Sequence, residues 1–314
     1  MRIKKGLQRE RYTNGIRRIV RRPETSDFDK PSYRLTTLSD LSKHHTYAPK
    51  WLSLVVIFIF FLVTGCGSTS RVRYESPQDA YESGKARYDE GKYDLAILFF
   101  QGAFDFGRSH EWAADAQLYL ARSYRANEDF LLAANEYARF TQIYRSDPRV
   151  ADAEYELALT YYERSPSYDF DQTDTERAIE QFRLFISRYQ DHPLVIEAQE
   201  RIVELREKLA RKKLDIAQMY ERLLRYEAAA MSFETIFDNY YDSSLADDAL
   251  VGAMRNYLEY GTKSIASRQA ERFQRVIDNY DRLIQIFPDS PLIKEAEVMY
   301  NEAKRQLGDT QTDS

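Results

Sequence analysis

The feature that most constrains this chain is a set of small and aromatic residues that recurs at a fixed spacing. In three places a small residue is followed twelve positions later by alanine, and four positions after that by an aromatic residue. The three sets are Gly84, Ala96 and Phe100; Ala121, Ala133 and Tyr137; and Ala217, Ala229 and Phe233. Small residues let two helices approach closely, and aromatic rings fill the gaps between neighbouring helix pairs. The spacing therefore predicts tandem helical hairpins.

This pattern is typical of the tetratricopeptide repeat, in which a tyrosine also follows the first small residue. Two further repeats depart from the spacing. They contain Ala158, Tyr161, Ala178 and Phe182, with residues 165–175 inserted as a loop, and Tyr257, Val276 and Tyr280, with residues 261–269 lengthened. Glycine and proline number only 11 and 9, which agrees with long helices. We therefore predict an all-α fold, a tetratricopeptide-like right-handed solenoid of about five helical hairpins.

A long helix is expected to join two blocks of repeats. Residues 193–220 contain no glycine and no helix breaker after Pro193, so they predict one helix of about 42 Å. It would connect repeats 1–3, residues 77–193, to repeats 4–5, residues 214–306. The basic segment 209–213 within it is either a solvated face, which we favour, or a partner-binding patch. The polar residues 307–314 are predicted to be a disordered tail.

Four motifs predict where helices begin. Ser76-Pro77, Asp147-Pro148 and Ser290-Pro291 each place a capping side chain before a proline suited to the first helical position. Thr173, followed three residues later by Glu176, predicts a capping box.

An apolar run precedes the repeats. Residues 51–65 are too few for a membrane-spanning helix, which needs about 20, but they suit the core of a secretory signal peptide. The run ends in Val63-Thr64-Gly65-Cys66, which resembles the bacterial lipobox. The resemblance implies removal of residues 1–65 and lipidation of Cys66, which leaves residues 66–76 as a lipidated tether. Gly67 at the next position points to the outer membrane.

Two alternatives remain open for this leader. The run could be an uncleaved signal anchor with an incidental cysteine. The 40 residues ahead of it are long for a signal peptide, so either translation begins internally near Leu38 or Leu41, or the leader is genuinely long.

The sequence offers little for catalysis. Residues 1–50 have 13 Lys/Arg against 5 Asp/Glu, and residues 66–314 have the remaining 32 against 45, so the repeats are acidic and unsuited to nucleic acid. Cys66 is the single cysteine, and His110 and His192, outside the leader, are expected on the surface. No phosphate-binding loop, nucleophile elbow or metal motif is present. We predict no catalytic residue, no metal and no cofactor.

The first helices of the repeats are expected to line a concave groove. Seven residues should face it: Tyr81, Lys85, Tyr88, Arg122, Arg125, Tyr155 and Tyr162. Such a basic and aromatic trough suits an extended peptide that ends in an aromatic residue and a carboxylate. The alternative is ordinary packing between repeats for Tyr155 and Tyr162 and solvent exposure for the two arginines.

Two segments carry a family resemblance. Residues 169–193, which include Asp171-Gln172-Thr173, and residues 197–240, together with the lipobox and repeats, resemble the BamD family of the outer-membrane β-barrel assembly machinery. One departure is that Tyr189-Gln190-Asp191 and Tyr240-Tyr241-Asp242 stand where Tyr-Pro-Asp is usual.

The resemblance implies a scaffold anchored by lipid to the periplasmic face of the outer membrane. Its expected partners are a BamA-like barrel component, held by the C-terminal repeats, and other assembly lipoproteins. The N-terminal repeats would receive the C-termini of unfolded outer-membrane proteins. The alternative is a different tetratricopeptide envelope lipoprotein, for example one that coordinates cell-wall synthesis.

Overall fold

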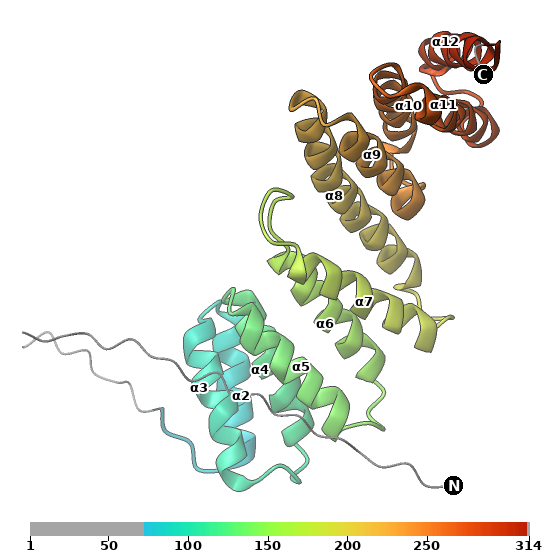
Figure 1. Ribbon diagram of the computed structural model, residues 1–314. Helices are drawn as coiled ribbons and strands as arrows, with labels where there is room; N and C mark the ends of the chain where they lie inside the picture. Colours follow the sequence, from blue (N-terminus) through green and yellow to red (C-terminus); the bar gives the residue numbers. More distant parts are fainter. Residues whose placement is uncertain (1–71, 313–314) are drawn as a thin grey trace, which may run out of the picture. The chain divides into compact units, whose positions relative to one another are not determined.

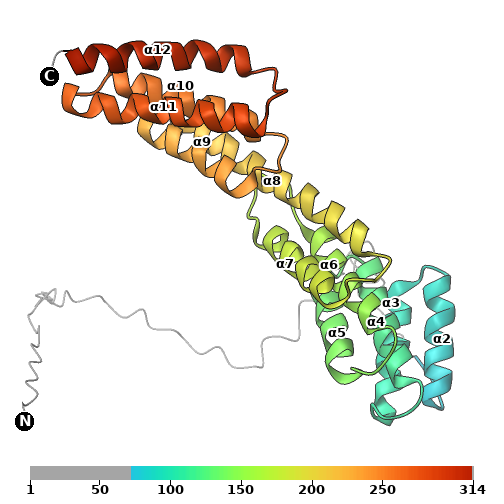
Figure 2. The same ribbon diagram turned by 90° about the vertical axis from the view of Figure 1, so that its right-hand side faces the viewer.

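The computed structural model describes residues 72–312, which form helices joined by turns and loops, with no strand in that range. The elements are α2 (Pro77–Asp89), α3 (Tyr93–Ala103), the 3₁₀ turn η1 (Phe104–Phe106), α4 (Ala113–Ala126), α5 (Phe130–Ile143), α6 (Val150–Arg164), α7 (Thr173–Arg188), α8 (Val195–Arg222), α9 (Tyr226–Tyr240), α10 (Ala246–Thr262), α11 (Ala266–Ile286) and α12 (Ile293–Thr312). Each α-helix packs against the next along the chain (Figures 1 and 2). The prediction of an all-α, tetratricopeptide-like helical solenoid is confirmed.

The repeating small residues form the cores of the hairpins α2/α3, α4/α5, α6/α7 and α8/α9. Seven alanines from the predicted register are fully buried: Ala96, Ala121, Ala133, Ala158, Ala178, Ala217 and Ala229. At the eighth position, a Cβ added to Gly84 would lie 2.8 Å from the ring of Phe100. The predicted aromatics Tyr137 and Phe182 are likewise fully buried. Close helix contact is therefore set by the residues that the spacing identified.

The fifth hairpin, α10/α11, uses glycines that the sequence pattern missed. Cβ atoms added at Gly252 and Gly261 would overlap the rings of Phe233 and Phe273, respectively. The lengthening expected around residues 261–269 lies in the helices and not in a loop, because only three residues separate α10 from α11. The two helices themselves are longer, at 17 and 21 residues.

Helix α8 is shared between two cores. It has 28 residues and corresponds to the long helix expected over 193–220. Its first half contributes Ala198 and Leu205 to a core with α6 and α7, and its second half contributes Leu214 and Ala217 to a core with α9–α12. One continuous helix therefore links the repeats before and after it.

Two lysines of α8, Lys208 and Lys212, hold the inserted loop, residues 165–172, whereas Arg211 and Lys213 of the basic segment are exposed. The Lys208 ammonium donates to Ser165 Oγ at 2.9 Å, and the Lys212 ammonium donates to the Phe170 carbonyl at 2.5 Å. Burial lowers the pKa of Lys208. Gln172 Nε2 donates to the carbonyls of Ser167 and Phe170 at 2.9 and 3.0 Å, which closes the loop from within.

Helix starts match the motifs only in part. Ser76 caps α2, since its hydroxyl accepts from the Asp79 amide at 3.1 Å. The other two proline motifs begin their helices later, because Asp147 and Ser290 accept from amides two residues on and shape the preceding turn. The capping box is also wrong: Thr173 is already the first residue of α7, whose cap residue is Gln172.

The C-terminal residues are more helical than the sequence suggested. Residues 307–312 of the expected disordered tail belong to helix α12. The leader, the lipobox and Cys66 lie outside residues 72–312, as do residues 313–314. No helix within 72–312 is long and apolar enough to cross a membrane.

Candidate functional site

A cavity of about 520 Å³ opens between α4, α5 and α6, and we call it the α4–α6 pocket. It is lined by Tyr88, Arg122, Arg125, Ala126, Tyr137, Asp152, Tyr155, Glu156, Glu163 and Leu194. Four of the seven residues expected in the groove are among them: Tyr88, Arg122, Arg125 and Tyr155. Helix α4 supplies both arginines, which lie three residues apart and therefore on one face.

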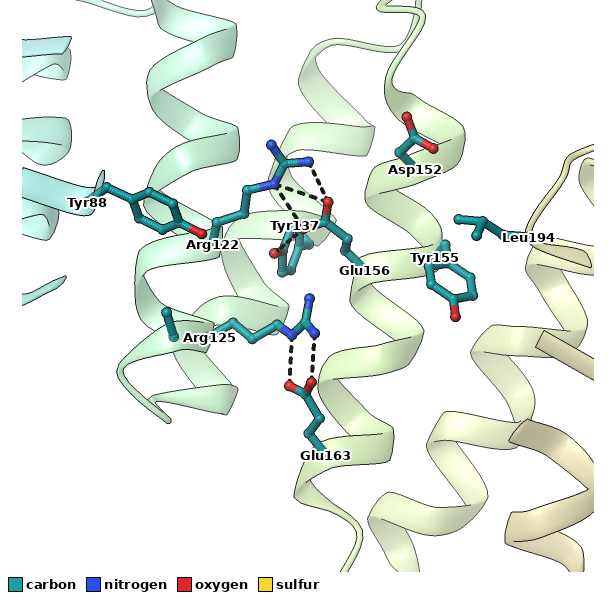
Figure 3. Close-up of a pocket in the computed structure, with 10 residues that line it drawn as sticks. Tyr88, Arg122, Arg125, Tyr137, Asp152, Tyr155, Glu156, Glu163 and Leu194 are labelled. Atoms are coloured by element: carbon teal, nitrogen blue, oxygen red, sulfur yellow. Dashed lines mark hydrogen bonds and ion pairs between the residues drawn. The ribbon is translucent and has the colours of Figure 1, made fainter. Parts of the chain in front are cut away.

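Both arginines of the pocket are held by glutamates from α6 (Figure 3). Arg125 donates from Nε and Nη2 to the two carboxylate oxygens of Glu163, at 2.7 and 2.6 Å. Arg122 binds Glu156 through the same two nitrogens. Hydrogen bonding to Glu163 raises the pKa of Arg125. Burial opposes the charge of Arg122, but Glu156 outweighs that effect and raises its pKa.

These pairs change the electrostatics expected of the groove. The pocket contains two guanidinium groups but three carboxylates, on Asp152, Glu156 and Glu163. The Asp152 carboxylate is half-exposed, and its Oδ1 lies 3.3 Å from His192 Nε2. The predicted trough is therefore not basic. Arg122 keeps its Nη1 group for a ligand, whereas the Arg125 guanidinium also interacts with the Tyr137 hydroxyl, and the charge of both arginines is balanced from within.

Two tyrosines of the pocket differ in how their hydroxyls are used. Tyr137 is fully buried, and its hydroxyl donates to the Glu156 carboxylate that binds Arg122. Burial raises the pKa of Tyr137 well above its ordinary value. Tyr155 packs its ring against Phe182 and Phe185, and its buried hydroxyl makes no well-aligned hydrogen bond within residues 72–312, although Glu197 and Arg201 lie close enough to affect its pKa.

The other three expected groove residues lie outside the pocket. The Tyr81 ring stacks on Trp112, with centroids 5.2 Å apart, and so packs one repeat against the next. Lys85 is paired with Asp89 on its own helix. The Tyr162 hydroxyl donates to Glu204 on α8 at 2.7 Å. Tyr162 therefore contacts the next repeat, as the packing alternative expected, and Tyr81 also packs between repeats.

The glutamate partners could have been found from the sequence. Glu156 follows Arg122 by 34 residues and Glu163 follows Arg125 by 38, which is about one repeat. The same relation recurs farther along, where Arg255 Nη1 lies 3.3 Å from Glu221 and Arg255 Nη2 lies 3.0 Å from Glu295. Opposite charges one repeat apart, on first helices, are thus a signal for inter-repeat ion pairs.

A second surface feature is the turn between α8 and α9, residues 223–225. Leu223 and Leu224 are 59% and 66% exposed, and Met219 one turn earlier is 40% exposed. Leu224 has a φ of 55°, a conformation that favours glycine. The flanking Arg222 and Arg225 are exposed and have no ion pair within the described range.

The equivalent turns of other repeats show how unusual this composition is. Gly91 and Glu128 occupy the same position, with φ of 73° and 63°. In all three turns the next amide bonds a carbonyl five residues back, as Arg225 does with Tyr220 at 2.9 Å. The fold thus requires this backbone shape but accepts polar residues or glycine there. Packing within the described residues does not explain why an exposed leucine occupies this strained position.

The part of the chain that the structure describes contains no group of three or more His, Cys, Asp or Glu side chains placed to hold a metal. His110 Nε2 lies 2.9 Å from the Ala103 carbonyl, and His192 contacts Asp152 and the ring of Phe185. Both histidines therefore serve local packing.

Stacked helical hairpins with an inter-helix pocket and an exposed apolar turn define a tetratricopeptide-like scaffold. A family model, YfiO, described as an outer membrane lipoprotein, matches residues 73–273, well over half of the chain. The chain belongs to this family of outer membrane lipoproteins.

Individual relatives agree. The protein named outer membrane protein assembly factor BamD from Caulobacter vibrioides is 24% identical over 225 residues, which cover 69% of this chain and 73% of that protein. Its namesake from Haemophilus influenzae is 23% identical over 237 residues, covering 72% and 89%. The resemblance to the BamD family is confirmed. A thermophilic TPR protein from Thermus thermophilus aligns with 73% of this chain and 98% of its own, at 16% identity and a TM-score of 0.30. Because that TM-score is low, the fold is assigned from the pattern of helices alone.

Proposed function

We propose that this chain is a non-enzymatic scaffold of outer-membrane protein assembly, anchored through lipid on Cys66 to the periplasmic face of the outer membrane. Membership of the family of outer membrane lipoproteins supports the location, and the names of the relatives support the process. The lipobox at residues 63–66 supports the anchor.

The C-terminal repeats hold the BamA-like barrel component in this proposal, and they also offer surface to other assembly lipoproteins. The observation that carries the proposal is the α8–α9 turn, where Leu223 and Leu224 are exposed between two arginines. Exposed apolar side chains that have a fixed backbone conformation suit burial in a partner's pocket, because little entropy is lost on binding. The arginines favour a partner surface with acidic residues at its rim.

The N-terminal repeats receive the C-termini of unfolded outer-membrane proteins in the same proposal, at the α4–α6 pocket. Tyr88 and Tyr155 provide aromatic walls, the Nη1 group of Arg122 can donate to a carboxylate or to peptide carbonyls, and Arg125 adds a second positive charge beside it. Reversing the charge of both arginines should therefore weaken capture of a peptide that ends in an aromatic residue, and unchanged capture would remove this part of the proposal.

The test of the main claim replaces Leu224 with glycine and uses Glu128→Gly as the matched control. Both changes relieve a positive φ, but only the first removes an apolar side chain. Binding of the purified chain to the periplasmic domains of the barrel component should weaken about tenfold for Leu224→Gly, because one buried leucine side chain contributes about 1.5–3 kcal/mol. Glu128→Gly should bind like the parent. Equal binding by all three chains, or capture of a cell-wall synthesis complex instead, would favour the alternative scaffold.

A further inference from the structure

The segment that follows the lipobox is docked onto the first hairpin by Tyr74. The hydroxyl of Tyr74 donates to the Asp105 carboxylate, and its ring meets the edge of Phe106, with centroids 6.1 Å apart. The ring also covers Gly102, where any Cβ would overlap it. Glycine inside a helix costs about 1 kcal/mol relative to alanine. Gly102 therefore makes α3 less stable but leaves room for the Tyr74 ring. The docking is therefore a built contact.

The docked segment lies beside an exposed aromatic residue. Phe106 ends the one-turn helix η1 and remains 46% exposed, although it packs one edge on Tyr74. Arg73, next to Tyr74, and Arg108, two residues after Phe106, are exposed, but the Arg108 guanidinium already lies 4.0 Å from the Phe104 ring and donates to Gln117 Oε1 at 2.6 Å. The acidic residues Glu75, Asp105 and Glu111 are exposed in the same region, so the surface carries a small net negative charge.

The length of chain before Tyr74 limits where this surface can be. Tyr74 is eight positions after Cys66, and an extended chain spans at most about 3.6 Å per position, or roughly 29 Å. If Cys66 is lipidated, as the proposed function holds, the first hairpin stays within that distance of the bilayer.

We propose that η1 is a second membrane contact, in which Phe106 enters the boundary between headgroups and acyl chains. Aromatic rings are favoured at that depth, and the exposed Arg73 beside the docked segment can extend its guanidinium group to a lipid phosphate. A single ring would bind a bilayer weakly from solution. The tether makes the contact intramolecular, at an effective concentration in the millimolar range, so even this weak contact can fix how the repeats face the membrane.

The test uses the mature chain from Cys66, with its thiol coupled to a maleimide lipid in phosphatidylcholine vesicles. This coupling replaces cellular lipidation, so the result stands even if the proposed function fails. Trp112 is the only tryptophan after Cys66 and provides the background signal. Phe106→Trp is compared with Ile286→Trp on α11, whose parent residue is 45% exposed. Brominated lipids should quench at least half of the added emission of Phe106→Trp and under a tenth of that of Ile286→Trp.

Tyr74→Ala tests the docking. In the Phe106→Trp chain it should reduce the quenching at least twofold, with the helical circular dichroism unchanged, because Tyr74 lies outside the helices. No quenching of Phe106→Trp, quenching equal to that of Ile286→Trp, or quenching that requires anionic lipid would each overturn the apolar contact. Quenching that survives Tyr74→Ala unchanged would overturn the role of the docked segment.

Discussion

Arg125 on α4 donates two parallel hydrogen bonds to Glu163 on α6, so a potential ligand-binding cation is neutralised by the next repeat. The side chains of this pair are 25% and 33% exposed, which leaves the pair open to competition from a ligand. An incoming carboxylate would meet the charge of Glu163 as well as that of Arg125. Glu163 therefore lowers the affinity of the pocket for anionic peptides.

Replacing Glu163 with glutamine should strengthen peptide binding. The change keeps the size of the side chain and releases the positive charge of Arg125, so a peptide with a free C-terminal carboxylate should bind about 3- to 10-fold more tightly at low salt. Stability should change by no more than about 1 kcal/mol, as is usual for a solvent-accessible ion pair. Titration of a fluorescent peptide measures the affinity.

The control for this change is Glu302→Gln, which removes a similarly exposed partner of Arg305 on α12. It should leave peptide affinity unchanged. The gain from Glu163→Gln should disappear in about 1 M salt and for an amidated peptide, because both remove the charge interaction. A gain that persists with the amidated peptide would mean that Arg125 does not read a carboxylate.

The two buried tyrosine hydroxyls of the pocket predict opposite results for the same substitution. Tyr137→Phe removes a hydrogen bond to a carboxylate and should cost about 1.5–3 kcal/mol of unfolding free energy. Tyr155→Phe removes a buried hydroxyl that makes no well-aligned hydrogen bond within residues 72–312, so it should be neutral or stabilising. Denaturant unfolding of both variants measures the difference. Equal losses would show that the two hydroxyls are in similar environments.

Alkaline pH should destabilise the protein through these same rings. Burial raises the pKa of Tyr155 to about 12, whereas the ordinary value is 10.0. Between pH 10 and 12 the unfolded chain loses this proton while the folded chain keeps it. Stability is therefore full below pH 10 and falls as the pH rises toward 12. Tyr155→Phe should lessen that fall in denaturant titrations at pH 9, 10 and 11, and an unchanged slope would contradict the assignment.

The sequence predicted helix pairing well because the spacing of small residues is a direct requirement of close packing. Ala121, Ala158 and Ala217 could be located without knowing any neighbour. The groove was harder, because its electrostatics depend on residues one repeat away, as Glu163 is from Arg125. Tyr81 packs on Trp112 instead of facing the groove, and no local sequence pattern gives the position of Trp112.

The strained turn was within reach of the sequence. Gly91, Glu128 and Leu224 each lie seven positions after the small residue of their repeat, Gly84, Ala121 and Ala217. Comparing these positions would have marked Leu224 as the exception. Two helix starts were predicted wrongly because a side chain that bonds a nearby amide can shape the preceding turn instead of capping the helix. The Asp147 carboxylate accepts from the Arg149 amide before α6, and the Asp171 carboxylate accepts from the amide of Thr173, the first residue of α7.

Glycine at the fifth hairpin should not tolerate a side chain. A Cβ at Gly252 would lie 2.7 Å from the Phe233 ring, which is only 2% exposed and cannot move freely. Gly252→Ala should therefore cost about 1–3 kcal/mol, less the roughly 1 kcal/mol that alanine gains in helix propensity. Gly308→Ala on α12, where the added atom meets open space, should be neutral or slightly stabilising. Thermal unfolding of the two variants provides the comparison, and equal melting temperatures would show that the Phe233 ring gives way.

Gln172 should control the inserted loop without supporting the rest of the fold. Its amide nitrogen holds two loop carbonyls, and its oxygen accepts from Thr175 at 2.8 Å. Thr175 keeps a second contact to Ser165, so Gln172→Ala leaves no buried hydroxyl without a partner. The loop should then open locally, and chymotrypsin should cleave after Tyr168 or Phe170 at least tenfold faster. Gln274→Ala, which removes only an exposed contact to Asp278, should leave the cleavage rate unchanged. If Gln172→Ala accelerated cleavage throughout the chain, the loop would instead be part of the cooperative core of repeats 3 and 4.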